Sequence, residues 1–243
     1  MAAAALQALL RMPLWGGGFL PAFVQLVTFY YLLGLVLHCV VPRLFVVQGI
    51  QKEPRGEGEP LRDAIASIGP LAVKAFYWAI VDHMYASGIG QLYSGPVTGA
   101  RHWGYIALCI CVMDYLHDSW FYWTHRLLHW RPLYRWVHWE HHSAFTGYAF
   151  HVAEALLVFA NELLLPLMFP IHMGLHRIYH LLTTLIHEAG HAGYELSPFI
   201  PTIEGLVSVL VAGPRGCLYF THWDRLCGTM HPCYDAQLFR YFK

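Results

Sequence analysis

Charge is what this sequence most lacks. Of its 243 residues only 12% are Asp, Glu, Lys or Arg, whereas charged residues make up roughly a quarter of soluble domains. Hydrophobic residues account for 57% of the chain and aromatic residues for 16%. A chain this apolar precipitates unless lipid covers much of its surface, so we expect an all-α, multi-pass membrane protein. The 15 basic and 15 acidic side chains balance, and we expect no nucleic-acid partner.

Paired cysteines are also missing. None of the six cysteines belongs to a CxxC pair, which excludes a zinc knuckle and a thioredoxin-like redox site. We expect reduced thiols, because most of the polar mass is expected on the cytosolic side of the membrane. Cys109 and Cys111 lie inside an apolar run, where they are expected to be small packing residues. The six are Cys39, Cys109, Cys111, Cys217, Cys227 and Cys233.

No basic segment precedes the first apolar run, so we expect no cleaved signal peptide. That run, Phe19–Val41, is long enough to cross a hydrocarbon core of about 30 Å. The last apolar stretch, Ala153–Met173, is followed closely by RIYHLLTTLI. We expect these two segments to form a hairpin kinked at Pro166 and Pro170. The further apolar stretches are Ile65–Ile89, Trp103–Trp123 and Ala153–Met173.

The polar segments indicate how the chain is oriented. Gln51–Asp63 is charged and contains two prolines, and it is predicted to be an exposed loop within an N-terminal membrane-spanning region, residues 1–105. Basic residues and tryptophans gather around the end of the third apolar stretch, as they do at a cytosolic membrane boundary. We therefore expect the segment from His117 to His142 at the cytosolic surface. The residues concerned are Arg126, Arg131, Arg135, Trp120, Trp123, Trp130, Trp136 and Trp139.

Histidine is abundant and clustered. The chain has 17 histidines, more than all its lysines and arginines together. Seven of them form three sets with helical spacing, in which residues three or four apart share one helix face. Neutral imidazole binds iron, zinc, copper and nickel, and crowding that many imidazoles without metal leaves lone pairs unpaired. We predict a metal site formed by His125, His129, His138, His141, His142, His187 and His191.

A simpler interpretation holds for the isolated histidines. A lone histidine in an apolar protein is usually a hydrogen-bonded core residue, and this is expected for His38, His83, His102, His172 and His176.

The stretch HEAGH, residues 187–191, matches the H-E-x-x-H motif of zinc proteases. A zinc protease needs that pair and one further ligand, which leaves most of the remaining histidines without a task. Seven nitrogen ligands exceed the needs of one tetrahedral zinc, so they indicate two metals, or one metal and an incomplete second site. Glu188 is then expected to orient an imidazole by accepting its other N–H.

Four ordered motifs resemble the fatty acid hydroxylase superfamily, which includes sterol C-5 desaturases, C-4 methyl sterol oxidases and sphingoid-base hydroxylases. HDSWFYWTHRLLHW and HWEHH resemble its first two histidine boxes, and HEAGHAGYE resembles its H-x-x-x-H pair. YFTHWDRLCGTMHP resembles its closing signature. The resemblance predicts a hydroxylase-like domain at residues 106–232, followed by a tail at 233–243.

The resemblance implies an enzyme of the endoplasmic reticulum membrane, with a helical stem and a cytosolic histidine-rich cap that holds two non-haem iron ions. Such enzymes use O2 and electrons from cytochrome b5 and its reductase to hydroxylate or desaturate a lipid. Zinc is a possible replacement in the purified protein. Beyond the seven ligands, Asp118 and Glu188 are assigned catalytic roles, and His117, His222 and Asp224 are assigned places beside the metal ligands.

One expected motif is absent from the sequence. The family carries a further H-x-x-H-H before the closing signature, but residues 192–221 contain no histidine. Either the metal centre is incomplete, or the sequence is a splice form or gene model that lacks a short segment, and the intact flanks favour the second explanation. Three functions therefore stay open: a lipid oxygenase, a catalytically incomplete lipid-binding or partner protein of the same fold, and an HExxH zinc protease.

Overall fold

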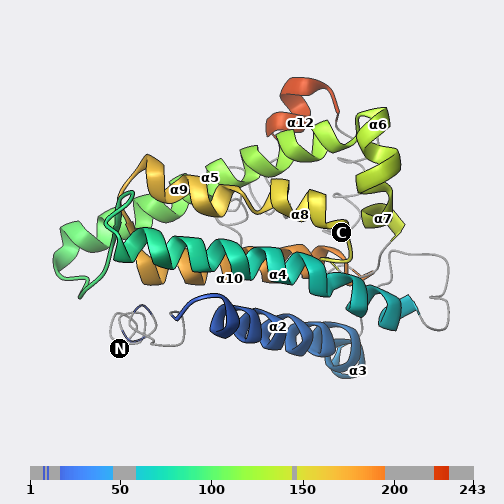
Figure 1. Cartoon of the computed structure of the whole chain (residues 1–243), viewed down its shortest axis with the longest axis horizontal. Helices are drawn as coiled ribbons and strands as arrows, with labels where there is room; N and C mark the ends of the chain where they lie inside the picture. Colours follow the sequence, from blue (N-terminus) through green and yellow to red (C-terminus); the bar gives the residue numbers. More distant parts are fainter. Residues whose placement is uncertain are drawn as a thin grey trace.

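Long apolar segments become long helices in the computed structural model, which describes residues 8, 10, 17–45, 59–143, 147–194 and 222–229 (Figure 1). Helix α2 (Phe19–Leu35) runs through a five-residue π-helix, η2 (Val36–Val40), into α3 (Val41–Leu44). Helix α4 (Glu59–Ala86) packs along α2. Within the described residues, the segments Phe19–Leu44 and Leu61–Ala86 are long and apolar enough to cross a membrane, as predicted for the first two apolar stretches.

The polar loop predicted at residues 51–63 ends earlier than expected. Residues 59–63 form the first turn of α4, where a proline is tolerated because the first N–H groups of a helix have no partner within it. Asp63 is buried and accepts hydrogen bonds from the neighbouring Arg62. Residues 51–58, and the C-terminal tail predicted at 233–243, lie outside the described residues.

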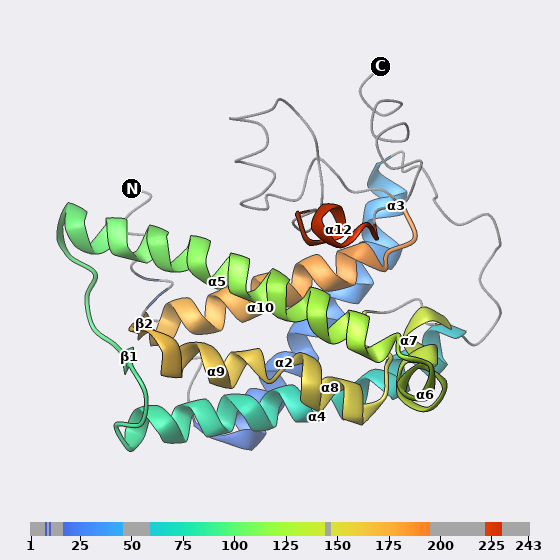
Figure 2. The ribbon, with the colours of Figure 1, turned by 90° about the horizontal axis from the view of Figure 1, so that it is seen from above.

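Helix α5 (Gly99–Leu128) extends beyond the apolar stretch predicted at Trp103–Trp123 at both ends. At about 1.5 Å per residue its 30 residues span about 45 Å. The extra turn after Trp123 places the first histidine pair at the far end of this helix, which forms one edge of the bundle in Figure 2.

The predicted hairpin is divided differently from expectation. Helix α8 (Val152–Val158) is followed by its C-cap residue, Phe159. Helix α9 (Asn161–Met168) begins two residues later and contains Pro166. The chain turns at Pro170 and returns as α10 (Met173–Gly190). At this turn β2 (Ile171–His172) pairs in parallel with β1 (Leu92–Tyr93), a two-residue exception to the all-α prediction.

Charged residues inside the bundle are paired between helices. Lys74 of α4 donates to the Glu162 carboxylate of α9, and both side chains are buried. Arg177 of α10 lies 2.6 Å from the Asp82 carboxylate of α4. Burial of such charges is tolerated where each has a partner, so these pairs join α9 and α10 to α4.

Of the isolated histidines predicted to be core residues, His172 and His176 are buried and hydrogen-bonded, whereas His83 is exposed. His172 caps α10 by accepting from the Gly174 N–H at 3.1 Å. His176 Nε2 lies 2.8 Å from the Glu162 carbonyl oxygen, and His102 Nε2 lies 3.1 Å from the Tyr93 hydroxyl.

Candidate metal centre

Three segments bring the seven predicted histidines together. The first pair ends α5, and a turn at Trp130 leads into α6 (Arg131–Leu133), whose second residue is a proline. The chain continues through the π-helix η3 (Tyr134–His138) into α7 (Trp139–Ser143), which carry the second set. The last pair ends α10. These segments lie at the same end of the bundle in Figure 2, so sequence sets as much as 66 residues apart form one site.

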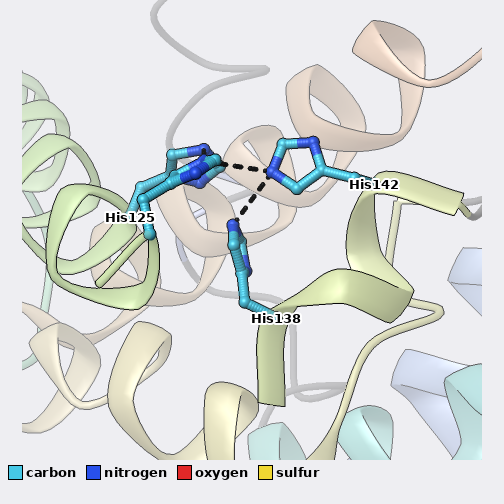
Figure 3. Close-up of side chains that lie close together, drawn as sticks. His125, His138 and His142 are labelled. Atoms are coloured by element: carbon cyan, nitrogen blue, oxygen red, sulfur yellow. Dashed lines mark hydrogen bonds between the residues drawn. The ribbon is translucent and has the colours of Figure 1, made fainter. Parts of the chain in front are cut away.

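The four-histidine cluster consists of His125, His129, His138 and His142. Their Nε2 atoms converge: consecutive nitrogens are 3.0 Å apart for His125 and His129, and 3.1 Å apart for His129 and His142. His142 and His138 are also separated by 3.1 Å and point toward one another in Figure 3. Four nitrogens bound tetrahedrally at 2.0–2.1 Å from zinc would be about 3.3 Å apart. These three separations are close to those of a tetrahedral site, and all four nitrogens lie within 4.8 Å of one another.

The three-histidine cluster consists of His141, His187 and His191. The rings of His141 and His191 lie 5.1 Å apart, and those of His187 and His191 lie 5.2 Å apart. His187 Nε2 lies 2.8 Å from the carbonyl oxygen of Gly147. A neutral imidazole that donates from Nε2 keeps its lone pair on Nδ1, which is then the nitrogen that His187 offers to a metal.

The two clusters are neighbours. The ring of His141 lies 5.1 Å from that of His138 and 5.9 Å from that of His125. Between them lies Glu154 of α8, whose Oε1 is 2.9 Å from His138 Nδ1 and 3.0 Å from His141 Nδ1. Sequence reasoning missed this carboxylate. Its only signal was an acidic residue in the apolar stretch AEALLVFANELLL, a position where a charge needs a partner.

Burial keeps the clustered imidazoles neutral. The pKa of His141 is lowered to about 2, first by burial and then by the neighbouring histidines. The pKa of His125 is lowered to about 3 for the same reasons, and burial also lowers the pKa values of His129 and His142. Metal ligands must be deprotonated, so at neutral pH these nitrogens have lone pairs available to a metal.

Glu188 lies away from the histidine nitrogens. It is buried, and its Oε1 lies against α2, 2.8 Å from the place where a Cβ would stand on Gly34. Burial raises the pKa of Glu188 to about 8. The carboxylate at ion-pair distance from ligand nitrogens is that of Glu154, so the orienting contact predicted for Glu188 is made by a different glutamate.

Two other predicted residues, Asp118 and Asp224, lie in one cavity. Asp118 and Asp224 line a cavity of about 490 Å³ beside His125 and His129, with the side chains of Phe121 and Tyr122 as its apolar walls. Asp224 belongs to α12 (His222–Cys227) and accepts a hydrogen bond from Thr229 at 2.7 Å.

His117 lies apart from both clusters. Its Nδ1 is 2.6 Å from the Asn161 amide nitrogen, and its ring lies 6.4 Å from that of His180. The side chain of His222 lies outside the described residues, as does the segment 195–221 where the absent histidine box was expected.

The chain is similar to sterol-modifying enzymes. It is 26% identical over 201 residues to a Δ7-sterol 5(6)-desaturase of Eremothecium gossypii, covering 73% of this chain and 53% of the relative. It is 32% identical to a lathosterol oxidase of Rattus norvegicus, covering 60% of this chain and 52% of the relative. It is 36% identical to a C-4 methylsterol oxidase of Schizosaccharomyces pombe, covering 40% and 37%. The chain thus spans about half the length of the first two relatives.

No solved structure matched the chain. The sequence profile of the fatty acid hydroxylase family, by contrast, matches residues 107–229, which include all seven clustered histidines and Glu154 between them. Family match and histidine geometry therefore agree, and the chain belongs to the fatty acid hydroxylase family.

Proposed function

We propose that this protein is a membrane-bound, metal-dependent oxidoreductase that hydroxylates or desaturates a lipid with O2. The observation that carries the proposal is the pair of adjacent histidine clusters in a chain of the fatty acid hydroxylase family. The relatives named as sterol desaturases and oxidases favour a sterol among the possible lipids, with sphingoid bases and fatty acyl chains as the other classes.

The two clusters are suited to two iron ions, one in each. Iron supplies the one-electron steps and the activation of O2 that cleavage of an unactivated C–H bond requires. For a hydroxylation, O2, two electrons, two protons and the C–H bond give an alcohol and water. We propose cytochrome b5 and its reductase as the source of the electrons.

The protein's own residues would hold the metals and line the place for the substrate. Neutral imidazoles of the two clusters supply the ligand nitrogens. The cavity beside His125 and His129, walled by Phe121 and Tyr122, offers an apolar surface for an alkyl group next to the four-histidine cluster. Asp118 and Asp224 line the same cavity. A carboxylate there is placed to accept a proton, or to accept a hydrogen bond from a hydroxyl group of the lipid.

The membrane arrangement belongs to the same proposal. Helices α2 to α4 and the helices packed on them would form a multi-pass stem in the endoplasmic reticulum, with the clusters in a cap on the cytosolic side. Support comes from the two segments long enough to cross a bilayer. Further support comes from three exposed tryptophans near the clusters, since indole rings favour the membrane boundary. They are Trp130, Trp136 and Trp139.

A second function follows from the unequal clusters. Four imidazoles complete a tetrahedral site, whereas three leave a position open, and the sequence lacks the H-x-x-H-H that would add donors. A chain that holds its second metal weakly would bind lipid, or an active relative, without oxidising it.

One experiment separates the two functions. The chain is expressed in microsomes of a host that lacks its own enzyme, supplied with cytochrome b5, and scanned for sterol, sphingoid and acyl products. We expect little product from the chain as it stands. A variant in which Ser208–Cys217 is replaced by a segment carrying H-x-x-H-H should approach two metals per chain and form product.

Two results would decide between the two functions. Robust lipid oxidation by the unmodified chain would support the first function and refute the second, because seven histidines would then suffice. A restored variant that binds two metals but oxidises none of the three lipid classes would refute the oxygenase proposal.

A further inference from the structure

Glu154 is the one described carboxylate that contacts both histidine clusters. Its Oε1 lies 2.9 Å from Nδ1 of His138 and 3.0 Å from Nδ1 of His141. His138 belongs to the four-histidine cluster and His141 to the three-histidine cluster. Because each ring is contacted through Nδ1, its Nε2 is the nitrogen left for a metal, and for His138 that nitrogen faces His142 at 3.1 Å.

The carboxylate is buried, and few donors or cations near it compensate its negative charge. Glu154 is 1% exposed, and neither its Oε2 nor Nδ1 of His138 or His141 makes a hydrogen bond among the described residues, so the two contacts of Oε1 are close approaches without hydrogen-bond geometry. A buried carboxylate costs several kcal/mol, on the order of the desolvation of one ion, unless cationic or N–H groups surround it. The nearest groups that can compensate it are the two imidazole rings, whose Nδ1 atoms lie 2.9 and 3.0 Å from Oε1.

Metal binding would supply the missing compensation. An imidazole that ligates a cation through Nε2 must carry its proton on Nδ1, and the metal makes that N–H a stronger donor. Glu154 has two oxygens for two such N–H groups, although in this structure one oxygen contacts both nitrogens and the other contacts neither. Each ring can therefore take one oxygen once both carry a metal.

We propose that Glu154 is a positioning residue that couples the two metal sites, so that loading of either cluster strengthens metal binding at the other. Loading the four-histidine cluster fixes the Nδ1–H tautomer of His138 and orders the carboxylate. The ordered carboxylate then favours the Nδ1–H tautomer of His141, which is the form that ligates through Nε2. The inference rests on the proposed metal sites, and linkage requires the coupling to be equal in both directions.

If Glu154 bound a metal ion directly, its loss would have a different effect on the metal content. Glu154, His138 and His141 also lie close enough to one another to hold a metal ion directly. In that case His138 would bridge two ions through its two ring nitrogens. Loss of the carboxylate would then remove a single metal and leave the remaining site unchanged.

The test is a titration of the purified full chain with Co²⁺ and Zn²⁺ after chelation, with metal per chain counted and the cobalt absorption bands recorded. In Glu154→Ala we expect metal affinity to fall at both clusters by about 10–100-fold, the usual effect of losing a group that orients a ligand. Glu154→Gln keeps an acceptor oxygen without the charge, and its loss should be intermediate. Glu162→Gln is the control, since Glu162 is also 1% exposed but contacts neither cluster.

Coupling itself is measured by a double-mutant cycle. His191→Ala removes a ligand from the three-histidine cluster alone. It should weaken cobalt binding at the four-histidine cluster when Glu154 is present and have no further effect in Glu154→Ala. Thermal melts in detergent identify variants that have lost the fold, and Glu162→Gln should lose stability while keeping its metal affinity.

The outcomes separate this inference from the proposal beneath it. If the unaltered chain binds no transition metal, the proposed function fails. If the chain binds metal but Glu154→Ala binds as tightly, or loses only one site, the coupling proposal is wrong and the metal sites stand. A His191→Ala effect of equal size with and without Glu154 would also overturn it.

Discussion

Gly147 is the position where one added methyl group should directly disturb one metal cluster and make no contact with the other. A Cβ added there would stand 2.8 Å from His187 Cδ2, and 3.1 and 3.2 Å from the Glu188 Cα and N atoms of α10. Ordinary contact at such a carbon begins at 3.4 Å. The ring of His187 must therefore move by about 0.6 Å, the difference between 3.4 and 2.8 Å, because the neighbouring helix backbone blocks the opposite adjustment.

That displacement exceeds what a metal site tolerates. Ligand distances are held to about ±0.2 Å, so a shift of about 0.6 Å breaks the bond from His187. The same substitution disturbs the Gly147 carbonyl oxygen, which lies 2.8 Å from His187 Nε2 and sets its tautomer. Gly147→Ala should thus lower zinc affinity at the three-histidine cluster by at least about tenfold, comparable to losing a group that orients a ligand.

The assay is metal per chain after reconstitution with zinc, followed by a cobalt titration read by absorption. We expect the variant to lose the weaker second site and to keep about one metal in the four-histidine cluster, with the reduced affinity there that coupling through Glu154 requires. Gly104→Ala is the matched control, since a Cβ on that α5 glycine meets nothing within 4 Å. Equal metal content and equal cobalt spectra in Gly147→Ala and the unaltered chain would refute this reasoning.

Three further predictions concern acidity, chemistry and topology. The pKa of His141 is about 2 in the folded chain and about 6.5 when unfolded. The unfolded state therefore binds the extra proton below pH 6.5, and the metal-free protein should lose about 2 kcal/mol of stability at pH 5 from this residue. Unfolding in detergent at pH 7.5 and 5 checks this loss, which His141→Asn should reduce. In the variant with the restored histidine box, Glu188→Gln should keep most lipid oxidation, whereas His141→Ala should abolish it. A peptide-cleaving activity that needs Glu188 and survives His141→Ala would instead establish the zinc protease. Glycosylation acceptors inserted beside Arg131 or Arg215 should both stay unmodified, and modification of one alone would contradict a single cytosolic cap.

Local spacing was enough to predict which histidines lie side by side at each helix end, because residues four apart on a helix share a face whatever the surrounding fold. The pairs at the ends of α5 and α10 needed no more than that. Division of the seven histidines into four and three could not be predicted. His138, His141 and His142 are close in sequence, yet His141 joins a pair that lies 46 residues further along the chain.

Tertiary packing decided what the sequence left ambiguous. Glu188 stands inside a motif and Glu154 in an apolar stretch, so motif reasoning pointed to Glu188, whereas the carboxylate beside the rings of His138 and His141 is that of Glu154. The break at Phe159 also has no proline or glycine to mark it. At this break the ring of Phe159 packs in the core, 5.1 Å from the ring of Tyr148. Such contacts depend on residues distant in sequence, and periodicity does not contain them.

The buried ion pairs of α4 have a consequence for how the protein is made. Lys74 and Asp82 meet their partners 88 and 95 residues later in the chain. At a synthesis rate of about 5–20 residues per second, Lys74 of α4 is synthesised roughly 4–18 s before Glu162. In the proposed membrane arrangement, α4 would wait at the insertion machinery with two uncompensated charges. Release into lipid would then depend on the arrival of α9 and α10, so the order of synthesis also sets the order of assembly.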